Sequence, residues 1–149
     1  MYFAIVAALM FALPVGSVIA DTMLRAHGLW SGAVVLKWFV FWSVGVRLLL
    51  AGLRQIAQPR YTAETILGIK GNESLLLVRE LGFANVATGS VGVCSWLFPT
   101  WLEPAAVAGM IFYGLAGINH IAAKRNSHQT IALLSDLFVA AVLLGAILI

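Results

Sequence analysis

Long apolar runs are the feature of this sequence that most constrains its fold. Five of them are long enough, or nearly so, to cross about 30 Å of hydrocarbon as helices, which takes roughly 20 residues each. They occupy residues 2–20, 30–53, 74–98, 104–123 and 129–149, with polar connectors between them. The sequence therefore predicts an all-α membrane protein, a single domain over residues 1–149 built as an antiparallel bundle of five transmembrane helices.

The composition excludes a soluble globular domain. Of the 149 residues, 62% are hydrophobic and 10% are charged, whereas soluble domains average about 45–50% and about 25%. The nine Lys and Arg residues are scattered among apolar segments, so we expect the lipid bilayer as partner and no nucleic acid. The single cysteine, Cys94, cannot form an internal disulfide, and the usual metal-binding spacings are absent, so no metal site is predicted.

The number of spans and their orientation depend on the first run. Residues 18–20 resemble a signal-peptide cleavage site, but no basic residue precedes the run, so we expect it to be retained. If it were cleaved or interfacial, four spans would remain. With five spans, the connectors 54–73 and 124–128 share the side of the amino terminus and hold five basic residues, against Arg25 alone on the other side. This bias predicts a multi-pass membrane protein with a cytoplasmic amino terminus.

Polar and ionisable side chains inside the runs are the candidate functional residues. Burying a charge near the centre of a membrane helix costs at least about 2.5 to 3.5 kcal/mol, so such groups are expected to pair or to meet water. At about 1.5 Å per residue, six polar residues from four runs fall roughly 5 to 10 Å below the cytoplasmic surface. They are Arg47, Arg79, Glu80, Asn119, His120 and Asp136. Their formal charges sum to zero, which predicts that most of them face one interior cavity open toward the cytoplasm.

Helical phase adds two candidate pocket-lining residues and one ion pair. Tyr113 shares a face of mostly small residues with His120, and Asn85 lies in a stripe of glycines on the third run. Small residues let helix backbones approach closely, so both faces are expected to pack inward. On the outer side, Lys37 is expected to pair with Glu103, at the start of the fourth run, by extending its long side chain.

Two interpretations of the polar cluster stay open. A structural ion-pair network that fixes the helix register and a site for a ligand, proton or ion explain its charges equally well. For His120, an interfacial histidine bonded to a neighbour or to water is favoured over haem ligation, because His27 and His128 lie in connectors.

Residues 79–125 carry a series of short motifs. These are Arg79-Glu80-Leu81-Gly82, Pro99, Pro104-Ala105-Ala106 and Asn119-His120 with a basic connector after it. The series resembles the central part of the DoxX-like family of small bacterial inner-membrane proteins. That resemblance implies an antiparallel helical bundle, with Glu80 and His120 at the family's glutamate and polar positions. Some members associate with redox complexes that act on sulfur compounds and quinone. The first run and the connector 54–73 depart from the family's pattern.

Three classes of function remain. Because no nucleophile, metal cluster or nucleotide-binding loop is visible, the sequence favours a non-catalytic subunit or a small-ligand-binding bundle. Such a bundle would work with a membrane partner or with further copies of itself. The first alternative is a proton- or ion-coupled transporter or channel that uses Glu80 and Asp136. The second is a redox membrane enzyme subunit with quinone or haem near Tyr113 and His120. The sequence names no substrate, cofactor or catalytic residue.

Overall fold

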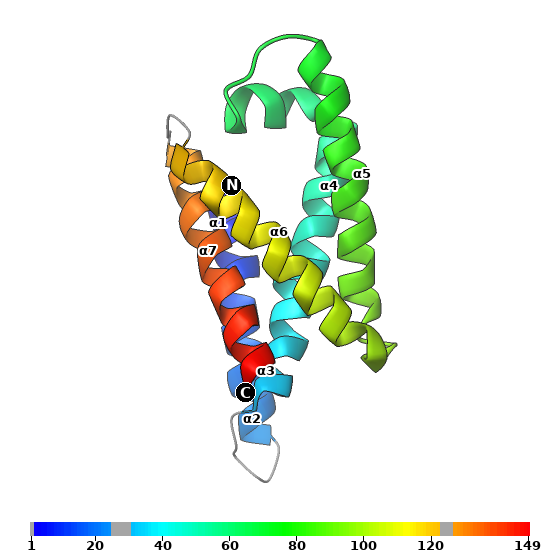
Figure 1. Ribbon diagram of the computed structural model, residues 1–149, viewed down its shortest axis with the longest axis vertical. Helices are drawn as coiled ribbons and strands as arrows, with labels where there is room; N and C mark the ends of the chain where they lie inside the picture. Colours follow the sequence, from blue (N-terminus) through cyan, green and yellow to red (C-terminus); the bar gives the residue numbers. More distant parts are fainter. Residues whose placement is uncertain (1, 25–30, 123–126) are drawn as a thin grey trace.

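The computed structural model describes residues 2–24, 31–122 and 127–149, and the regular secondary structure in these ranges is entirely helical. This confirms the predicted all-α class. In chain order the elements are α1 (Tyr2–Ala7), η1 (Ala8–Ala12), α2 (Leu13–Leu24), α3 (Gly32–Phe39), η2 (Val40–Val46), α4 (Arg47–Ala57), η3 (Tyr61–Ile66), α5 (Glu73–Cys94), η4 (Pro99–Trp101), α6 (Leu102–Ala122) and α7 (Ser127–Leu148). Segments α1, η1 and α2 form one continuous helix, as do α3, η2 and α4 (Figure 1).

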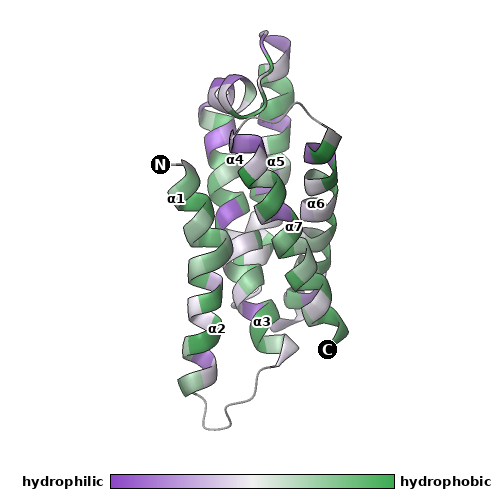
Figure 2. Cartoon of the chain, turned by 90° about the vertical axis from the view of Figure 1, so that its left-hand side faces the viewer, coloured by the Kyte–Doolittle hydropathy of each residue, from purple (hydrophilic) through white to green (hydrophobic). Residues whose placement is uncertain are grey.

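Four helices in the described ranges are long and apolar enough to cross a membrane. They cover Phe3–Leu24, Gly32–Ala57, Pro99–Ile121 and Ser127–Leu148. Helix α5 has 22 residues but is not one of the four, because Arg79 and Glu80 lower its mean hydropathy. The outward faces of α6 and α7 are mostly hydrophobic (Figure 2).

The helices do not end where the apolar runs end. The first helix continues past Ala20 to Leu24, and the second continues past Leu53 to Ala57. Polar residues can occupy the last turns of a helix when their side chains find partners, so an apolar run marks only the middle of the helix. The second helix starts where the Ser31 hydroxyl accepts a hydrogen bond from the backbone N–H of Val34 at 3.3 Å, which is an N-cap.

The continuous helix α3–η2–α4 lies at the centre of the bundle. Helices α2, α5, α6 and α7 all contact it, and α6 packs along α7 (Figures 1 and 2). Its buried Val40, Val44 and Leu48 form the main hydrophobic core together with residues such as Val139 and Leu143 of α7. Every polar group that this central helix carries inward is therefore surrounded by neighbouring helices.

Glycines bring α5 directly against the central helix. A Cβ atom added at Gly52 would lie 2.6 Å from the carbonyl oxygen of Gly82, and one added at Gly92 would lie 2.7 Å from the backbone nitrogen of Gly45. Such distances leave no room for a side chain, which confirms the close approach expected from the glycine stripe. Residue numbers rise in opposite directions along this contact, so the two helices are antiparallel.

Two wide π-helical turns, η1 and η2, lie side by side in the middle of the first two helices. The Ser43 hydroxyl donates to the carbonyl of Leu9 at 3.2 Å, and the Tyr113 hydroxyl donates to the carbonyl of Ser43. Because a π turn shifts hydrogen bonding from i+4 to i+5, η2 changes the phase of every α4 side chain relative to α3. Helix α4 begins with Arg47 directly after this turn.

The connector after α4 folds back over the bundle. It contains η3 and then turns at Gly68 and Gly71. Both glycines have positive φ values, 71° and 123°, which side-chain-bearing residues rarely adopt. The turn lets η3 lie across the end of the bundle before α5 begins (Figure 1).

Candidate functional site

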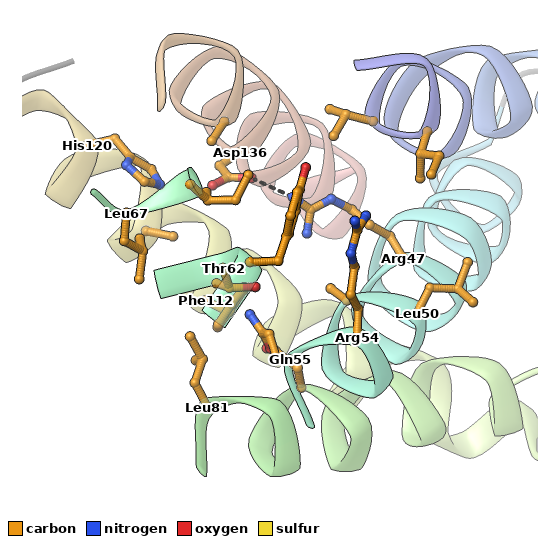
Figure 3. Close-up of a pocket in the computed structure, with 18 of the residues that line it drawn as sticks. Arg47, Leu50, Arg54, Gln55, Thr62, Leu67, Leu81, Phe112, His120 and Asp136 are labelled. Carbon is orange, nitrogen blue, oxygen red and sulfur yellow. Dashed lines mark hydrogen bonds and ion pairs between the residues drawn. The ribbon is translucent and has the colours of Figure 1, made fainter. Parts of the chain in front are cut away.

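A cavity of about 440 Å³ lies between α1, α4, η3, α5, α6 and α7. Small-molecule sites commonly occupy about 300 to 1,000 Å³. Its polar lining residues come from five of these elements, and the other side chains that line it are apolar (Figure 3). They are Arg47, Arg54, Gln55, Tyr61, Thr62, Asn85, Asn119, His120 and Asp136.

An ion pair between α4 and α7 forms one side of the cavity. A guanidinium nitrogen of Arg47 lies 3.8 Å from a carboxylate oxygen of Asp136, and their side chains are 15% and 6% exposed (Figure 3). The Arg47 guanidinium also lies 5.5 Å from the centre of the buried Tyr113 ring. Both partners are buried, so the removal of either side chain would leave the charge of the other inside the bundle.

A second arginine, Arg54, extends from α4 into the same cavity two turns after Arg47 (Figure 3). Its guanidinium lies 3.7 Å from the centre of the Tyr61 ring, which is a close cation–π contact. Tyr61 begins η3, so this contact also fixes the connector to α4. A stacked guanidinium uses its flat face and keeps its N–H edges available for hydrogen bonding.

Two amides join α4 to α5 at the cavity wall. The Asn85 side-chain nitrogen donates to the Gln55 side-chain oxygen at 2.8 Å, and both side chains are buried. Gln55 and its neighbour Arg54 lie eight and seven positions after Arg47 in α4, so all three side chains reach the wall from the same face of that helix.

The connector that holds η3 covers one side of the cavity. The side-chain nitrogen of Gln129 in α7 donates to the carbonyls of Ile66 and Leu67 at 3.4 and 3.5 Å. Ile66, Leu67 and the buried Thr62 all line the cavity. This segment is thus tied to α4 through Tyr61 and to α7 through Gln129.

The structure brings together four of the six residues of the expected polar cluster. Arg47, Asn119, His120 and Asp136 line the cavity, and so does Asn85. Arg79 and Glu80 are exposed and do not line it, so their expected place in the cluster is corrected. The reason is phase: α5 buries Val78, Gly82, Asn85, Gly89 and Gly92, and the two charged residues lie beside that inward line.

Two further expectations change. Tyr113 is fully buried and lies beneath Arg47, where its ring supports the guanidinium instead of lining the pocket.

The expected ion pair between Lys37 and Glu103 also changes. Lys37 lies 3.0 Å from a carboxylate oxygen of Asp21, whereas Glu103 is exposed. Asp21 was assigned to a connector, but α2 continues through it, which places its carboxylate beside α3.

The surroundings of Lys37 are largely aromatic. Its ammonium lies 4.6 Å from the Trp38 ring centre and 4.7 Å from that of Trp96. The indole N–H of Trp38 donates to the same Asp21 oxygen at 2.9 Å. We call Asp21, Lys37, Trp38 and Trp96 the aromatic clamp.

Sequence reasoning missed Arg54, Gln55 and Tyr61 as wall residues. All three lie beyond residue 53, the expected end of the second apolar run. The amphipathic face that starts at Arg47 and repeats at positions 51, 54 and 55 is the signal that could have extended the helix. Among the described residues, no group of three or more His, Cys, Asp or Glu side chains is placed to hold a metal ion.

Fold and cavity together define a class: an all-helical protein with four helices suited to crossing a membrane and a charged cavity among its helices. The chain belongs to the DUF6790 family, a family of unknown function whose model matches residues 2–149. No curated protein and no solved structure matches the chain. The family match provides no link to DoxX-like proteins, so that resemblance stays a prediction.

Proposed function

We propose that this protein crosses the bacterial inner membrane with five helices. Four helices are suited to this by length and composition. The fifth, α5, lies antiparallel against α4 and η2 from Gly82 to Gly92, so it follows the central helix across the same thickness. The exposed leucines and phenylalanine of α5, including Leu76, Leu77 and Phe83, would then meet lipid.

The basic connectors support an amino terminus in the cytoplasm. Reporter fusions inserted after Gly68 and after Ile149 should read opposite sides of the membrane, the first cytoplasmic and the second external. If both fusions read cytoplasmic, four spans replace five.

In this membrane setting the protein binds a small ligand in the cavity. The observation that carries this proposal is the cavity of about 440 Å³ itself, with charged and amide side chains from several helices on an otherwise apolar wall. A purely structural ion-pair network needs contact between its members and no space beside them. The chain would act as a binding subunit, with a membrane partner or a second copy using the bound ligand.

Filling the cavity tests this function. Ala116 lines the cavity from α6, so Ala116→Phe should occupy space that the ligand needs. Ala108, on the same helix, is exposed on the outer face, so Ala108→Phe is the matched control. Each protein is purified in detergent, and its solvent extract is analysed by mass spectrometry. We expect a small molecule that co-purifies at about one copy per chain with the wild type and A108F, and that is lost in A116F. The same extract from all three proteins would contradict the proposal.

Proton-coupled transport is a second candidate, favoured by the position of Asp136 alone. Its carboxylate is buried and lines the cavity, whereas Glu80 is exposed outside it. The transporter hypothesis thus keeps one of its two carboxylates. In proteoliposomes, proton-driven uptake that Asp136→Asn abolishes and Glu80→Gln preserves would favour this candidate over binding alone.

A further inference from the structure

The cavity wall carries more positive than negative charge. Arg47 is matched by Asp136, but Arg54 has no carboxylate within 4.0 Å among the residues that the structure describes. Glu64, the first acidic residue of the connector after α4, is paired instead with Arg60 at 3.7 Å on the surface. A guanidinium that faces a cavity without an anionic partner is suited to binding an oxyanion.

Stacking fixes the direction in which Arg54 can bind. The centre of its guanidinium lies 3.7 Å from the centre of the Tyr61 ring, so the ring covers one side of the group and N–H donors remain for hydrogen bonds elsewhere. Arg47, with its own carboxylate partner, lines the same cavity (Figure 3). An oxyanion bound to Arg54 would therefore lie at the polar side of the cavity formed by α4.

Apart from the nine polar residues given above, the wall is apolar. Leu50, Ile66, Leu67, Leu81 and Phe112 line it, from four different elements. A free inorganic anion would leave these side chains uncovered. A ligand that fills the cavity needs an alkyl part beside its charged group, because the apolar lining is stabilised only by apolar contact.

The cavity also reaches the outer surface of the bundle. Three of its lining residues, Ile5, Leu50 and Leu81, are also 39%, 50% and 37% exposed. In a membrane these side chains contact lipid, so an alkyl chain can enter sideways from the hydrocarbon. A volume of about 440 Å³ is near the lower end of ligand pockets, which accommodates one short chain and not the two chains of a phospholipid.

We propose, as an extension of the ligand-binding function above, that the cavity binds a single-chain amphiphile with an anionic headgroup. The headgroup, a carboxylate or a phosphate, is held by Arg54. The chain lies against Phe112 and the leucine side chains of the wall.

Site-resolved photolabelling tests this proposal. The full-length protein is placed in nanodiscs of phosphatidylcholine, which carries no net charge, and is labelled with decanoate that has a diazirine near the end of its chain. Labelled peptides are identified by mass spectrometry, which separates the cavity residues from the lipid-facing residues. Unlabelled decanoate, decyl phosphate, decanol, acetate and inorganic phosphate are the competitors.

Labelling should concentrate on the cavity residues of α5 and α6. Decanoate or decyl phosphate should displace it, decanol should need about tenfold more, and acetate or phosphate should have no effect. Whichever of the two anionic amphiphiles competes better identifies the headgroup. If decanol competes as well as decanoate, the anionic class is wrong while the ligand-binding function stands. If no probe labels the cavity above the lipid-facing background, the amphiphile proposal fails, whereas the ligand-binding function is decided by the extracts of the wild type, A108F and A116F.

Variants of Arg54, near the end of α4, and of Arg60, just after it, provide the matched comparison. Arg54→Gln should raise the decanoate concentration needed for half-maximal labelling about tenfold, because the headgroup loses its charged donor. Arg60→Gln removes the same charge from an exposed side chain, and it should leave labelling unchanged. Equal labelling in R54Q and R60Q would overturn the role of Arg54. If R54Q does not fold, Arg54→Lys, which keeps the charge, should preserve the preference for decanoate over decanol, and loss of that preference would contradict the proposal.

Discussion

The central helix carries a cation stacked on aromatic rings near each of its ends, and the two are used differently. In the aromatic clamp, Lys37 lies between two tryptophans and has a carboxylate, Asp21, 3.0 Å away. In the cavity, Arg54 lies on one tyrosine and has no carboxylate beside it among the described residues. The clamp satisfies its charge internally and joins α2 to α3. The cavity places the Arg54 guanidinium, which has no carboxylate partner among the described residues, beside a volume that a ligand can fill. This is the arrangement of a binding site.

An aromatic contact alone therefore does not distinguish a structural cation from a ligand-binding one. Both stacking contacts fix the orientation of a side chain. A cavity lies beside each cation, about 310 Å³ next to Lys37 and about 440 Å³ next to Arg54. What separates the two ends is the internal anion, because Lys37 is paired with Asp21, whereas no carboxylate among the described residues is paired with Arg54.

The largest effect is expected from the buried pair beside the cavity. Asp136→Ala leaves Arg47 buried without its carboxylate, which should lower the free energy of unfolding by about 3 to 5 kcal/mol. Denaturation by SDS from mild detergent measures the change. The double variant Arg47→Met with Asp136→Leu should recover most of the loss, because no charge is left inside. Equal and additive losses from both substitutions would show that the pair is not a coupled unit.

The next effect concerns the contact that holds the cavity wall in place. Gly52→Ala puts a methyl group 2.6 Å from the Gly82 carbonyl oxygen and should cost about 1 to 3 kcal/mol, since the backbones must separate. Gln55 and Asn85 lie next to this contact, so ligand labelling should fall as well. Gly145→Ala, with nothing within 4 Å of its added methyl, is the control and should be neutral or slightly stabilising. Equal stability of the two variants would contradict the close packing.

A smaller effect is expected at the aromatic clamp. Asp21→Asn removes the charged acceptor shared by Lys37 and Trp38, which should lower the free energy of unfolding by about 1 to 2 kcal/mol. Labelling of the cavity by photoreactive decanoate should not change. A large loss of labelling in D21N would mean that the two ends are coupled, and the contrast between clamp and site would then be wrong.

The smallest effects should come from the carboxylates that the structure places outside both regions. Glu80→Gln and Glu103→Gln alter exposed side chains, so each should change the free energy of unfolding by less than about 0.5 kcal/mol. In a double-mutant cycle with Lys37→Met, Glu103→Gln should be additive. A coupling of 1 kcal/mol or more, measured by the same SDS denaturation, would restore the pair between Lys37 and Glu103.

The depth of a residue along its helix could be predicted from the sequence, whereas the direction in which its side chain points could be predicted only in part. Counting residues from the connectors placed Arg47 and Asp136 at one level, and the structure pairs them. The same count included Arg79 and Glu80, but adjacent residues on a helix differ by about 100° in direction. The inward line of α5 through Gly82 and Asn85 turns both charged residues outward.

Helix ends were the other limit. Apolar runs predicted where helices cross hydrocarbon, but Asp21, Arg54 and Gln55 continue helices past those runs because each finds a partner on another element. Lys37 and Asn85 lie 16 and 30 positions from their partners, and Tyr61 lies in a different element from Arg54. Single-sequence periodicity holds no information on such pairings between elements. The wide η2 turn adds a phase shift that an ideal 3.6-residue period does not contain.

We propose a ligand in the cavity and none in the aromatic clamp. An experimental density map of the full-length protein in nanodiscs, with no ligand added, tests this claim most directly. We expect elongated density that starts at the Arg54 guanidinium and follows Phe112 and Leu81, with the Lys37 ammonium still bound to Asp21 and no extra density beside it. A map in which Arg54 turns to Glu64 and the side chains of α4 and α6 close the cavity would contradict the claim.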